Sequence, residues 1–132
     1  MKINGKHWRT IWLEPHGSSI GLIDQRKLPH NLTSQIINTY EEAANAIQRM
    51  VGRGAPLIGV TGAYGVFLAA KENKELKFIQ DACEYLNSAR PTAVNLSWAL
   101  NRMLQKAFDS KSNNIIKNLC KEANKILEED IN

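Results

Sequence analysis

The feature that most constrains this fold is an almost unbroken apolar stretch at residues 57–70, preceded by Pro56. Proline has a fixed φ suited to the first position of a helix, and a helix that is hydrophobic on all sides is buried on all sides. Gly59, Gly62 and Gly65 recur at every third residue, so one edge of the helix lacks side chains and lets another backbone approach closely. Each glycine costs about 1 kcal/mol of helix propensity against alanine, which packing must offset. We therefore expect residues 56–70 to form the central helix of a bundle.

Amphipathic helices are expected on both sides of this central helix. Thr39 and Glu42 form a T-x-x-E capping box, which marks the start of a helix that Gly52 or Gly54 ends by adopting a positive φ. Another helix begins at about Thr92, whose hydroxyl is suited to capping it. The apolar positions of the four expected helices recur at helical spacing: Ala43, Ala44, Ile47, Met50 and Val51; Leu76, Ile79, Ala82, Cys83 and Leu86; Leu96, Leu100, Met103, Leu104 and Ala107; Ile115, Ile116, Leu119, Ala123, Ile126 and Leu127.

The N-terminal segment has a strand-like pattern instead. Residues 9–13 and 19–23 are short apolar runs separated by the turn-rich residues 14–18. Such a pattern predicts a β-hairpin. Residues 24–29 then lead out of it, and Pro29 punctuates the chain before the helical part.

Length and composition fit one domain of the α+β class that is mainly helical. The chain has 132 residues, of which 43% are hydrophobic and 23% charged. We expect a hairpin or small antiparallel sheet with its exit segment in residues 1–35 and a helical bundle in residues 36–132. No apolar stretch approaches the roughly 20 residues that span a bilayer, and no secretory signal pattern opens the chain. The sequence therefore predicts a cytoplasmic protein with no membrane partner.

The cysteines and the charges argue against several classes of function. Cys83 and Cys120 are too few for a disulfide scaffold and have no Cys or His at metal-ligand spacing, so each is expected to be a small buried thiol, and no metal is expected. The net charge is +4, but the lysines are spread out as on solvated helix faces. Trp8, Trp12 and Trp98 stand at positions expected for packing, whereas nucleic-acid binding needs exposed aromatics among clustered cations. We expect no nucleic-acid partner.

Two short motifs place an arginine beside the start of a helix: Arg53-Gly54-Ala55-Pro56 and Ala89-Arg90-Pro91-Thr92. Free N–H groups and the helix dipole make a helix start suited to anions, and small residues let a ligand reach the backbone. Two arginines at two helix starts are suited to grip one phosphate from different sides. The alternative is that each arginine is an ordinary surface or salt-bridging residue.

The last expected helix ends on three negative charges, Glu128-Glu129-Asp130. The C-terminal end of a helix dipole favours cations, and no Gly or Pro closes this helix. Either the end of the helix frays, or the sequence stops inside a larger protein. We favour the second interpretation.

Three motifs carry a resemblance to a known family. They are Leu22-Ile23-Asp24-Gln25-Arg26-Lys27-Leu28-Pro29, Arg53-Gly54-Ala55-Pro56-Leu57-Ile58-Gly59-Val60 and Arg90-Pro91-Thr92-Ala93-Val94-Asn95-Leu96. In this order and spacing they resemble 5-methylthioribose-1-phosphate isomerase of methionine salvage, over essentially the whole chain. The resemblance implies that residues 1–132 are the N-terminal domain, and that a Rossmann-like catalytic domain is absent from this chain. It implies a homodimeric isomerase that acts on a sugar phosphate without a metal or organic cofactor.

The resemblance also implies roles for individual residues. The family holds the phosphate of its substrate with residues that match Arg53, Gly54, Ala55 and Arg90. Gly52 and Ala89 depart from the family's usual residues, and either change is one that loosens its loop without removing the cation.

No catalytic residue is assigned to this chain, because the family's general acid and base, a cysteine and an aspartate, belong to the second domain. Cys83 and Cys120 lie in helical core patterns outside the family motifs, and Asp24 is expected to have a structural role at the strand exit. No catalytic role is assigned to the histidines, which are His7, His16 and His30.

An alternative function comes from the same superfamily. It includes ribose-1,5-bisphosphate isomerase and the regulatory subunits of the translation initiation factor two-B exchange complex, which bind phosphorylated ligands or partner subunits. The D-Q-R-K-L-P and R-P-T-A-V-N-L segments favour the methylthioribose isomerase. A non-catalytic regulatory or scaffold subunit, or a ribose-1,5-bisphosphate isomerase-like protein, is the alternative.

Overall fold

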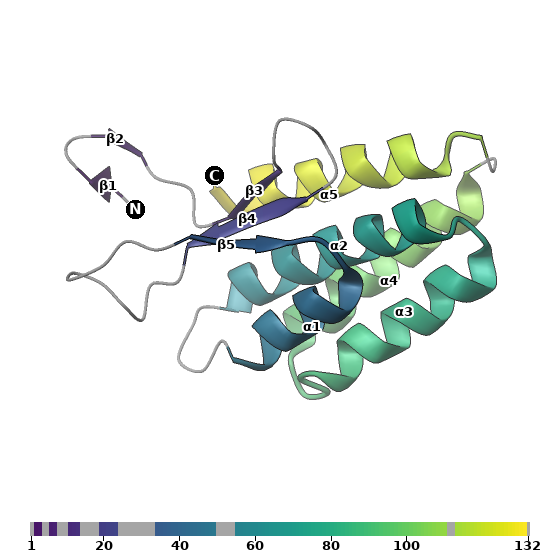
Figure 1. The fold of residues 1–132 in the computed structure, drawn as a ribbon, viewed down its shortest axis with the longest axis horizontal. Coiled ribbons are helices and arrows are strands. Elements are labelled where there is room, and N and C mark those ends of the chain that lie inside the picture. The colour runs from purple at the N-terminus through teal and green to yellow at the C-terminus, as the bar shows by residue number, and fades with distance from the viewer. Residues whose placement is uncertain are drawn as a thin grey trace. The chain divides into compact units, whose positions relative to one another are not determined.

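The computed structural model describes residues 2–3, 6–7, 11–13, 19–23, 34–49, 55–110 and 113–131. They belong to two compact units, Met1–Asn38 and Thr39–Asn132 (Figure 1). The strands lie in the first unit and the helices in the second. The fold class is therefore α+β and mainly helical, as the sequence predicts.

The described strands of the first unit form two antiparallel sheets. One is a pair of short strands, and the other has three strands in the order β3-β4-β5. The pairing of β3 with β4, with Leu13 opposite Ile20, confirms the predicted hairpin. The strands are β1 (Lys2–Ile3), β2 (Lys6–His7), β3 (Ile11–Leu13), β4 (Ile20–Ile23) and β5 (Ser34–Ile37).

The third strand of the larger sheet, β5, was not expected from the sequence. Ile20 lies directly opposite Ile37, and both are buried, whereas Ile36 is 43% exposed. Side chains that alternate in this way show the period of two of a strand with one covered face. The buried hydroxyl of Ser19, just before β4, donates a hydrogen bond to the side-chain oxygen of Asn38, just after β5. Residues 34–37 are too few to be recognised as a strand from their own pattern, and their pairing with β4 defines them as one.

The described helices of the second unit are packed around α2. This helix contacts each of the four others. Every residue from 58 to 70 is buried, which confirms the predicted central helix. The helices are α1 (Tyr40–Gln48), α2 (Ala55–Glu72), α3 (Leu76–Ser88), α4 (Val94–Asp109) and α5 (Ile115–Ile131).

The glycines of α2 allow its neighbours to approach closely. A Cβ on Gly59 would lie 3.0 Å from the carbonyl oxygen of Asn95 in α4, so the two backbones are in contact there. Gly62 faces Leu96 of α4, and Gly65 faces side chains of α1 and α3. These contacts confirm the predicted bare edge. Helices α2 and α4 start at the same end of the helical unit and run in the same direction, so they are parallel (Figure 1).

The first helix begins as predicted and ends earlier. Thr39 is its N-cap, and the Thr39 Oγ1 accepts a hydrogen bond of 3.1 Å from the backbone N–H of Glu42. The helix ends at Gln48, and Arg49 is its C-cap in the right-handed helical region of φ and ψ, so α1 stops before the predicted glycines. The remaining predicted residues of this segment, Met50, Val51, Gly52 and Gly54, lie outside the described residues.

Four predictions about single residues are wrong. Thr92 does not cap α4, because the N-cap is Ala93, which makes no side-chain hydrogen bond. Leu76, in the first turn of α3, is 40% exposed, and Trp98 in α4 is 51% exposed, so neither is a core residue. Cys83 is buried as expected, but Cys120 is only half-buried. The helical period predicts the side of a helix correctly, but whether a neighbour covers that side depends on tertiary packing.

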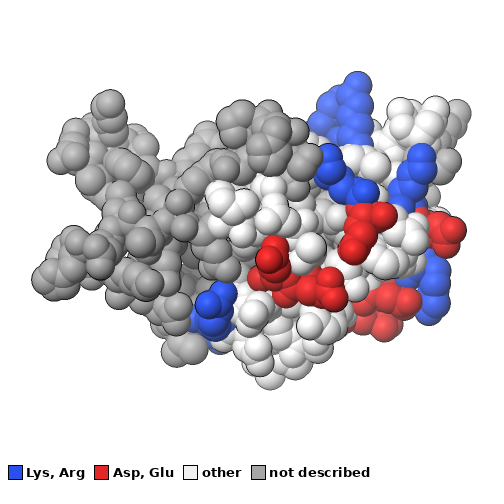
Figure 2. Space-filling view, in the orientation of Figure 1, with Lys and Arg blue, Asp and Glu red and all other residues white. Residues whose placement is uncertain are grey.

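The surface of the described residues carries mixed charges. On the face drawn in Figure 2, basic and acidic side chains are interspersed. Nucleic-acid binding uses a contiguous basic stripe or patch, which the described part of this face does not present. Among the described residues, no helix is both long and apolar enough to cross a membrane.

Candidate phosphate-binding site

Two helix N-termini lie side by side at one end of the helical unit. α2 and α4 both start there, next to the C-terminal ends of α1 and α3 (Figure 1). Gly59, in the second turn of α2, is in contact with the backbone of Asn95, in the first turn of α4. This contact holds the first turns of the two helices at close range. We call this end of the unit the α2/α4 start.

The α2/α4 start is suited to an anion. Parallel helices direct the positive ends of their dipoles to the same place. Neither helix has an acidic residue in its first turn, and the N-cap of α4, Ala93, offers no side-chain acceptor to the free N–H groups. The positive potential there is therefore not offset by the first turns themselves. By contrast, the first turn of α1 contains Glu41 and Glu42.

Arg90 lies between α3 and α4, and its guanidinium reaches the end of α1. Its Nε donates a hydrogen bond of 2.9 Å to the carbonyl oxygen of Ile47, and its Nη2 lies 3.5 Å from the carbonyl oxygen of Gln48. The last carbonyls of a helix lack partners within the helix, and a cation is favoured at this end of the dipole. Arg90 therefore caps α1, a contact that the sequence did not suggest, and its predicted role as a phosphate ligand stays a prediction.

This contact places the cation of Arg90 at the α2/α4 start. In the sequence α2 is the next helix after α1, and Arg90 joins the end of α1 to the segment that leads into α4. Of the other predicted phosphate ligands, Arg53 and Gly54 lie outside the described residues, and Ala55 is the first residue of α2. The structure thus brings Ala55 and Arg90 to the same end of the helical unit.

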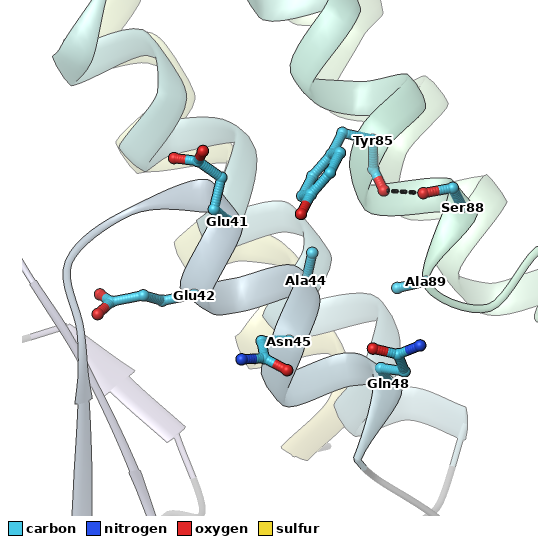
Figure 3. Close-up of a pocket in the computed structure, with 8 residues that line it drawn as sticks. All are labelled: Glu41, Glu42, Ala44, Asn45, Gln48, Tyr85, Ser88 and Ala89. Atoms are coloured by element: carbon cyan, nitrogen blue, oxygen red, sulfur yellow. Dashed lines mark hydrogen bonds between the residues drawn. The ribbon is translucent and has the colours of Figure 1, made fainter.

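A groove of about 480 Å³ lies between α1 and α3, close to Arg90 in the chain (Figure 3). Its charged lining residues are Glu41 and Glu42, which repel an anion. The ring of Tyr85 on its α3 side makes an edge-to-face contact with Tyr40, at 5.7 Å between centroids. Burial, with the carboxylate of Glu41 as a smaller cause, raises the pKa of Tyr40. Because its charged lining residues are both glutamates, the groove is not suited to bind the phosphate. Its lining residues are Glu41, Glu42, Ala44, Asn45, Gln48, Tyr85, Ser88 and Ala89.

The cysteine thiols are poorly suited to catalysis. Burial raises the pKa of the Cys83 thiol to about 12, so the thiolate that acts as a nucleophile does not form at neutral pH. Burial also raises the pKa of Cys120. Among the described residues, no three His, Cys, Asp or Glu side chains are grouped so that they could hold a metal ion. The residues Asp24, His16 and His30 lie outside the described part of the chain.

A cluster on α4 and α5 was not found from the sequence. Arg102 of α4 donates to Glu122 at 2.5 Å and to both carboxylate oxygens of Glu129 at 2.9 and 2.8 Å. Its guanidinium carbon lies 5.3 Å from the centroid of the Trp98 ring. In the sequence, two spacings indicate this cluster. The two glutamates are seven residues apart, which places them on one side of α5, and Trp98 and Arg102 stand at i, i+4. Neither identifies the partner helix.

Comparison with known proteins shows the family. The model of the initiation factor 2 subunit family matches residues 51–132. Among curated proteins, the methylthioribose-1-phosphate isomerase of Rhodospirillum centenum is 42% identical over 131 residues, which are 99% of this chain and 35% of that protein. The chain therefore spans about a third of the length of such relatives.

Two solved structures resemble the chain closely. The translation initiation factor eIF-2B subunit delta from A. fulgidus has a TM-score of 0.85 at 35% identity. The match covers 95% of this chain and 38% of that protein. The 5-methylthioribose 1-phosphate isomerase from Pyrococcus horikoshii has a TM-score of 0.84 at 35% identity over 94% of this chain and 37% of its own. An isomerase and an initiation factor thus share this fold almost equally. With a family model that matches residues 51–132, the chain belongs to the initiation factor 2 subunit family.

Proposed function

We propose that this chain is the phosphate-gripping domain of an aldose–ketose isomerase that converts 5-methylthioribose 1-phosphate to 5-methylthioribulose 1-phosphate in methionine salvage. The observation that carries the proposal is the α2/α4 start, where two parallel helix N-termini without acidic first-turn residues lie beside Arg90. The identity of 42% to an isomerase over 99% of the chain supports this substrate.

The proposed roles follow the chemistry of the groups. The backbone N–H groups of Gly54 and Ala55 and the guanidinium of Arg53 bind phosphate oxygens through charge-assisted hydrogen bonds. Arg90 binds the same phosphate with the N–H groups that it does not use on the carbonyls of Ile47 and Gln48, and thereby ties the ligand to the end of α1. The phosphate holds the sugar in place while hydrogen moves between adjacent carbons.

The acid and base of the reaction are not assigned to this chain. If they lie outside these residues, as we propose, the 132 residues alone bind the sugar phosphate without turning it over. For the longer protein we propose a cytoplasmic homodimer that needs neither a metal nor an organic cofactor and binds no nucleic acid or membrane.

The alternative is a non-catalytic regulatory subunit of the initiation factor two-B type. The TM-score of 0.85 to an initiation factor subunit supports it. Sequencing the coding region beyond Asn132 separates the two functions. A following reading frame that lacks an active-site Cys and Asp would favour the regulatory subunit.

The phosphate site is tested by titrating the chain with inorganic phosphate and with 5-methylthioribose 1-phosphate while following backbone amides by NMR. The largest shifts are expected at Gly54, Ala55 and Ala93. Because the chain spans about a third of the length of its isomerase relatives, the affinity is expected to be weak, about millimolar.

Variants of the arginines sharpen this titration. Replacing Arg53 with Ala is expected to weaken binding roughly tenfold to a hundredfold, since a charge-assisted hydrogen bond contributes about 1.5–3 kcal/mol. Arg90→Lys keeps a cation at the end of α1 but loses the planar fork, so part of the affinity remains. Lys74→Ala is the matched control, because it removes an exposed cation between α2 and α3, at the opposite end of the unit. Equal weakening by Arg53→Ala and Lys74→Ala would show that binding is a nonspecific effect of charge.

A further inference from the structure

The segment between α3 and α4 is held to both helices by backbone hydrogen bonds around Arg90. The backbone N–H of Arg90 donates a hydrogen bond of 3.2 Å to the carbonyl oxygen of Asn87, in the last turn of α3. The carbonyl oxygen of Arg90 accepts one of 3.0 Å from the backbone N–H of Ala93, the N-cap of α4. The position of the Arg90 backbone therefore depends on how the end of α3 and the start of α4 are placed relative to each other.

A side-chain hydrogen bond fixes that placement. The Oγ of Ser97, in the first turn of α4, donates a partly buried hydrogen bond of 3.0 Å to the side-chain oxygen of Asn87. Asn87 thus makes two contacts at once, because its backbone carbonyl binds Arg90 and its side chain binds α4. We call the hydrogen bond between the side chains of Asn87 and Ser97 the α3/α4 bridge.

The guanidinium of Arg90 needs this placement to be exact. Its Nε and Nη2 lie 2.9 and 3.5 Å from the carbonyl oxygens of Ile47 and Gln48 at the end of α1. A guanidinium has five N–H groups, so others remain for a ligand. Hydrogen bonds depend on distance and angle, so a guanidinium that shifts by about 1 Å loses much of its binding to a phosphate. Arg90 can reach α1 and a ligand together only if its backbone stays in one place.

An equivalent bridge joins α4 to α5 at the other end of α4. The side-chain nitrogen of Asn118, in the first turn of α5, donates a hydrogen bond of 2.9 Å to the Oγ of Ser110. As in the α3/α4 bridge, a half-buried asparagine meets a half-buried serine across the segment between two consecutive helices. This second bridge lies far from Arg90, so Asn118 is the matched control for Asn87.

We propose that Asn87 and Ser97 are positioning residues of the phosphate site. The α3/α4 bridge holds the backbone of Arg90, so that its guanidinium reaches the end of α1 and the α2/α4 start together. Neither Asn87 nor Ser97 touches the phosphate, and both act through Arg90. The proposal rests on the proposed function in that the ligand of Arg90 is taken to be a phosphate.

The first test needs no ligand. NMR of the 132-residue chain measures the rate at which the Nε–H of Arg90 exchanges its hydrogen with water, which is slow while this group is bonded to Ile47. Asn87→Ala is expected to speed this exchange roughly threefold to tenfold, the factor that corresponds to one hydrogen bond, because the guanidinium leaves α1 more often. Asn118→Ala removes an equivalent bridge and is expected to leave the exchange unchanged.

Two variants of Ser97 separate the hydrogen bond from the shape of the side chain. Threonine keeps the hydroxyl, and valine has nearly the same shape without it. Ser97 lines a groove of about 320 Å³ between α3 and α4, which has room for the additional methyl group. In the titration with inorganic phosphate, Ser97→Val is expected to weaken binding roughly threefold to tenfold, whereas Ser97→Thr is expected to bind as the unchanged chain does.

A double-mutant cycle shows whether the bridge acts through Arg90. In a chain that already carries Arg90→Ala, Asn87→Ala is expected to cause no further loss of phosphate affinity, because the guanidinium that it positions is gone. A bridge that only stabilises the helices would lower the affinity by the same factor in both backgrounds.

The proposal is overturned by unchanged Nε–H exchange in Asn87→Ala, by an equally large effect of Asn118→Ala, or by equal phosphate affinities of Ser97→Val and Ser97→Thr. The two proposals fail separately. Faster exchange in Asn87→Ala together with no phosphate-induced shifts at the α2/α4 start refutes the proposed function alone. Phosphate binding at the α2/α4 start with unchanged exchange in Asn87→Ala refutes the positioning role alone.

Discussion

Replacing Arg102 with Met is expected to destabilise the helical unit strongly, although Arg102 lies near its surface. The side chain of Arg102 is 24% exposed and that of its partner Glu122 only 11% exposed. Removing the arginine leaves the carboxylate of Glu122 largely out of water with no cation to compensate it. Its second partner, Glu129, is exposed and remains hydrated.

The size of the effect follows from this difference in exposure. At an effective dielectric constant of about 20, two unit charges about 4 Å apart attract by roughly 4 kcal/mol, and desolvation cancels part of this. Removing one partner of a fully buried pair costs about 3–5 kcal/mol, so for this partly exposed pair we expect about 2–3 kcal/mol. For a domain of this size, that lowers the Tm by about 10 °C.

Urea and thermal unfolding followed by circular dichroism measure the change. Lys77→Met is the matched control, because it removes a cation from an ion pair whose side chains are 80% and 55% exposed, and it is expected to cost less than about 0.5 kcal/mol. Adding Glu122→Gln to Arg102→Met is expected to recover part of the loss, because no buried unpaired charge remains and the exposed Glu129 stays hydrated. If Arg102→Met and Lys77→Met have equal effects, the reasoning from partial burial is refuted.

The remaining predictions concern the core, the cysteines and acid stability. Amide hydrogen exchange is expected to be slowest in α2, and exchange there as fast as at the helix ends would contradict its central position. At pH 8, iodoacetamide is expected to modify Cys120 before Cys83, which reacts only on unfolding because burial raises its pKa to about 12; mass spectrometry reads the order. Gly59→Ala is expected to lower stability by about 1 kcal/mol, since overpacking outweighs the gain in helix propensity; unchanged or increased stability would show that α4 yields without cost. The hydrogen bond from Arg102 lowers the pKa of Glu129, so its stabilisation is present above the ordinary pKa of glutamate and is lost as pH falls through the lowered value. An NMR titration is expected to show this lowered pKa, and Arg102→Met to abolish it.

Sequence reasoning succeeded where the interactions are local. The Thr39 cap depends on a contact three residues away, and the burial of residues 58–70 follows from a run with no polar side. The glycine spacing of α2 correctly predicted a close backbone approach, which the contact of Gly59 with Asn95 confirms.

Sequence reasoning failed where a neighbour had to be known. β5 is a strand because β4 lies beside it, and Trp98 is exposed because no described helix covers the outward side of α4. The helical period that predicted the side of each helix carries no information about which sides another element covers.

The candidate site divides in the same way. The sequence by itself determined that Arg90 lies between two helices and that Ala55 lies at the start of another, because helix boundaries depend on capping and on residues a few positions apart. Only the tertiary structure decided that α2 and α4 run parallel and start together, and that Arg90 caps α1 through Ile47, 43 residues earlier in the chain. A contact at that separation depends on how several helices pack around one core, and no periodicity within a single helix encodes it.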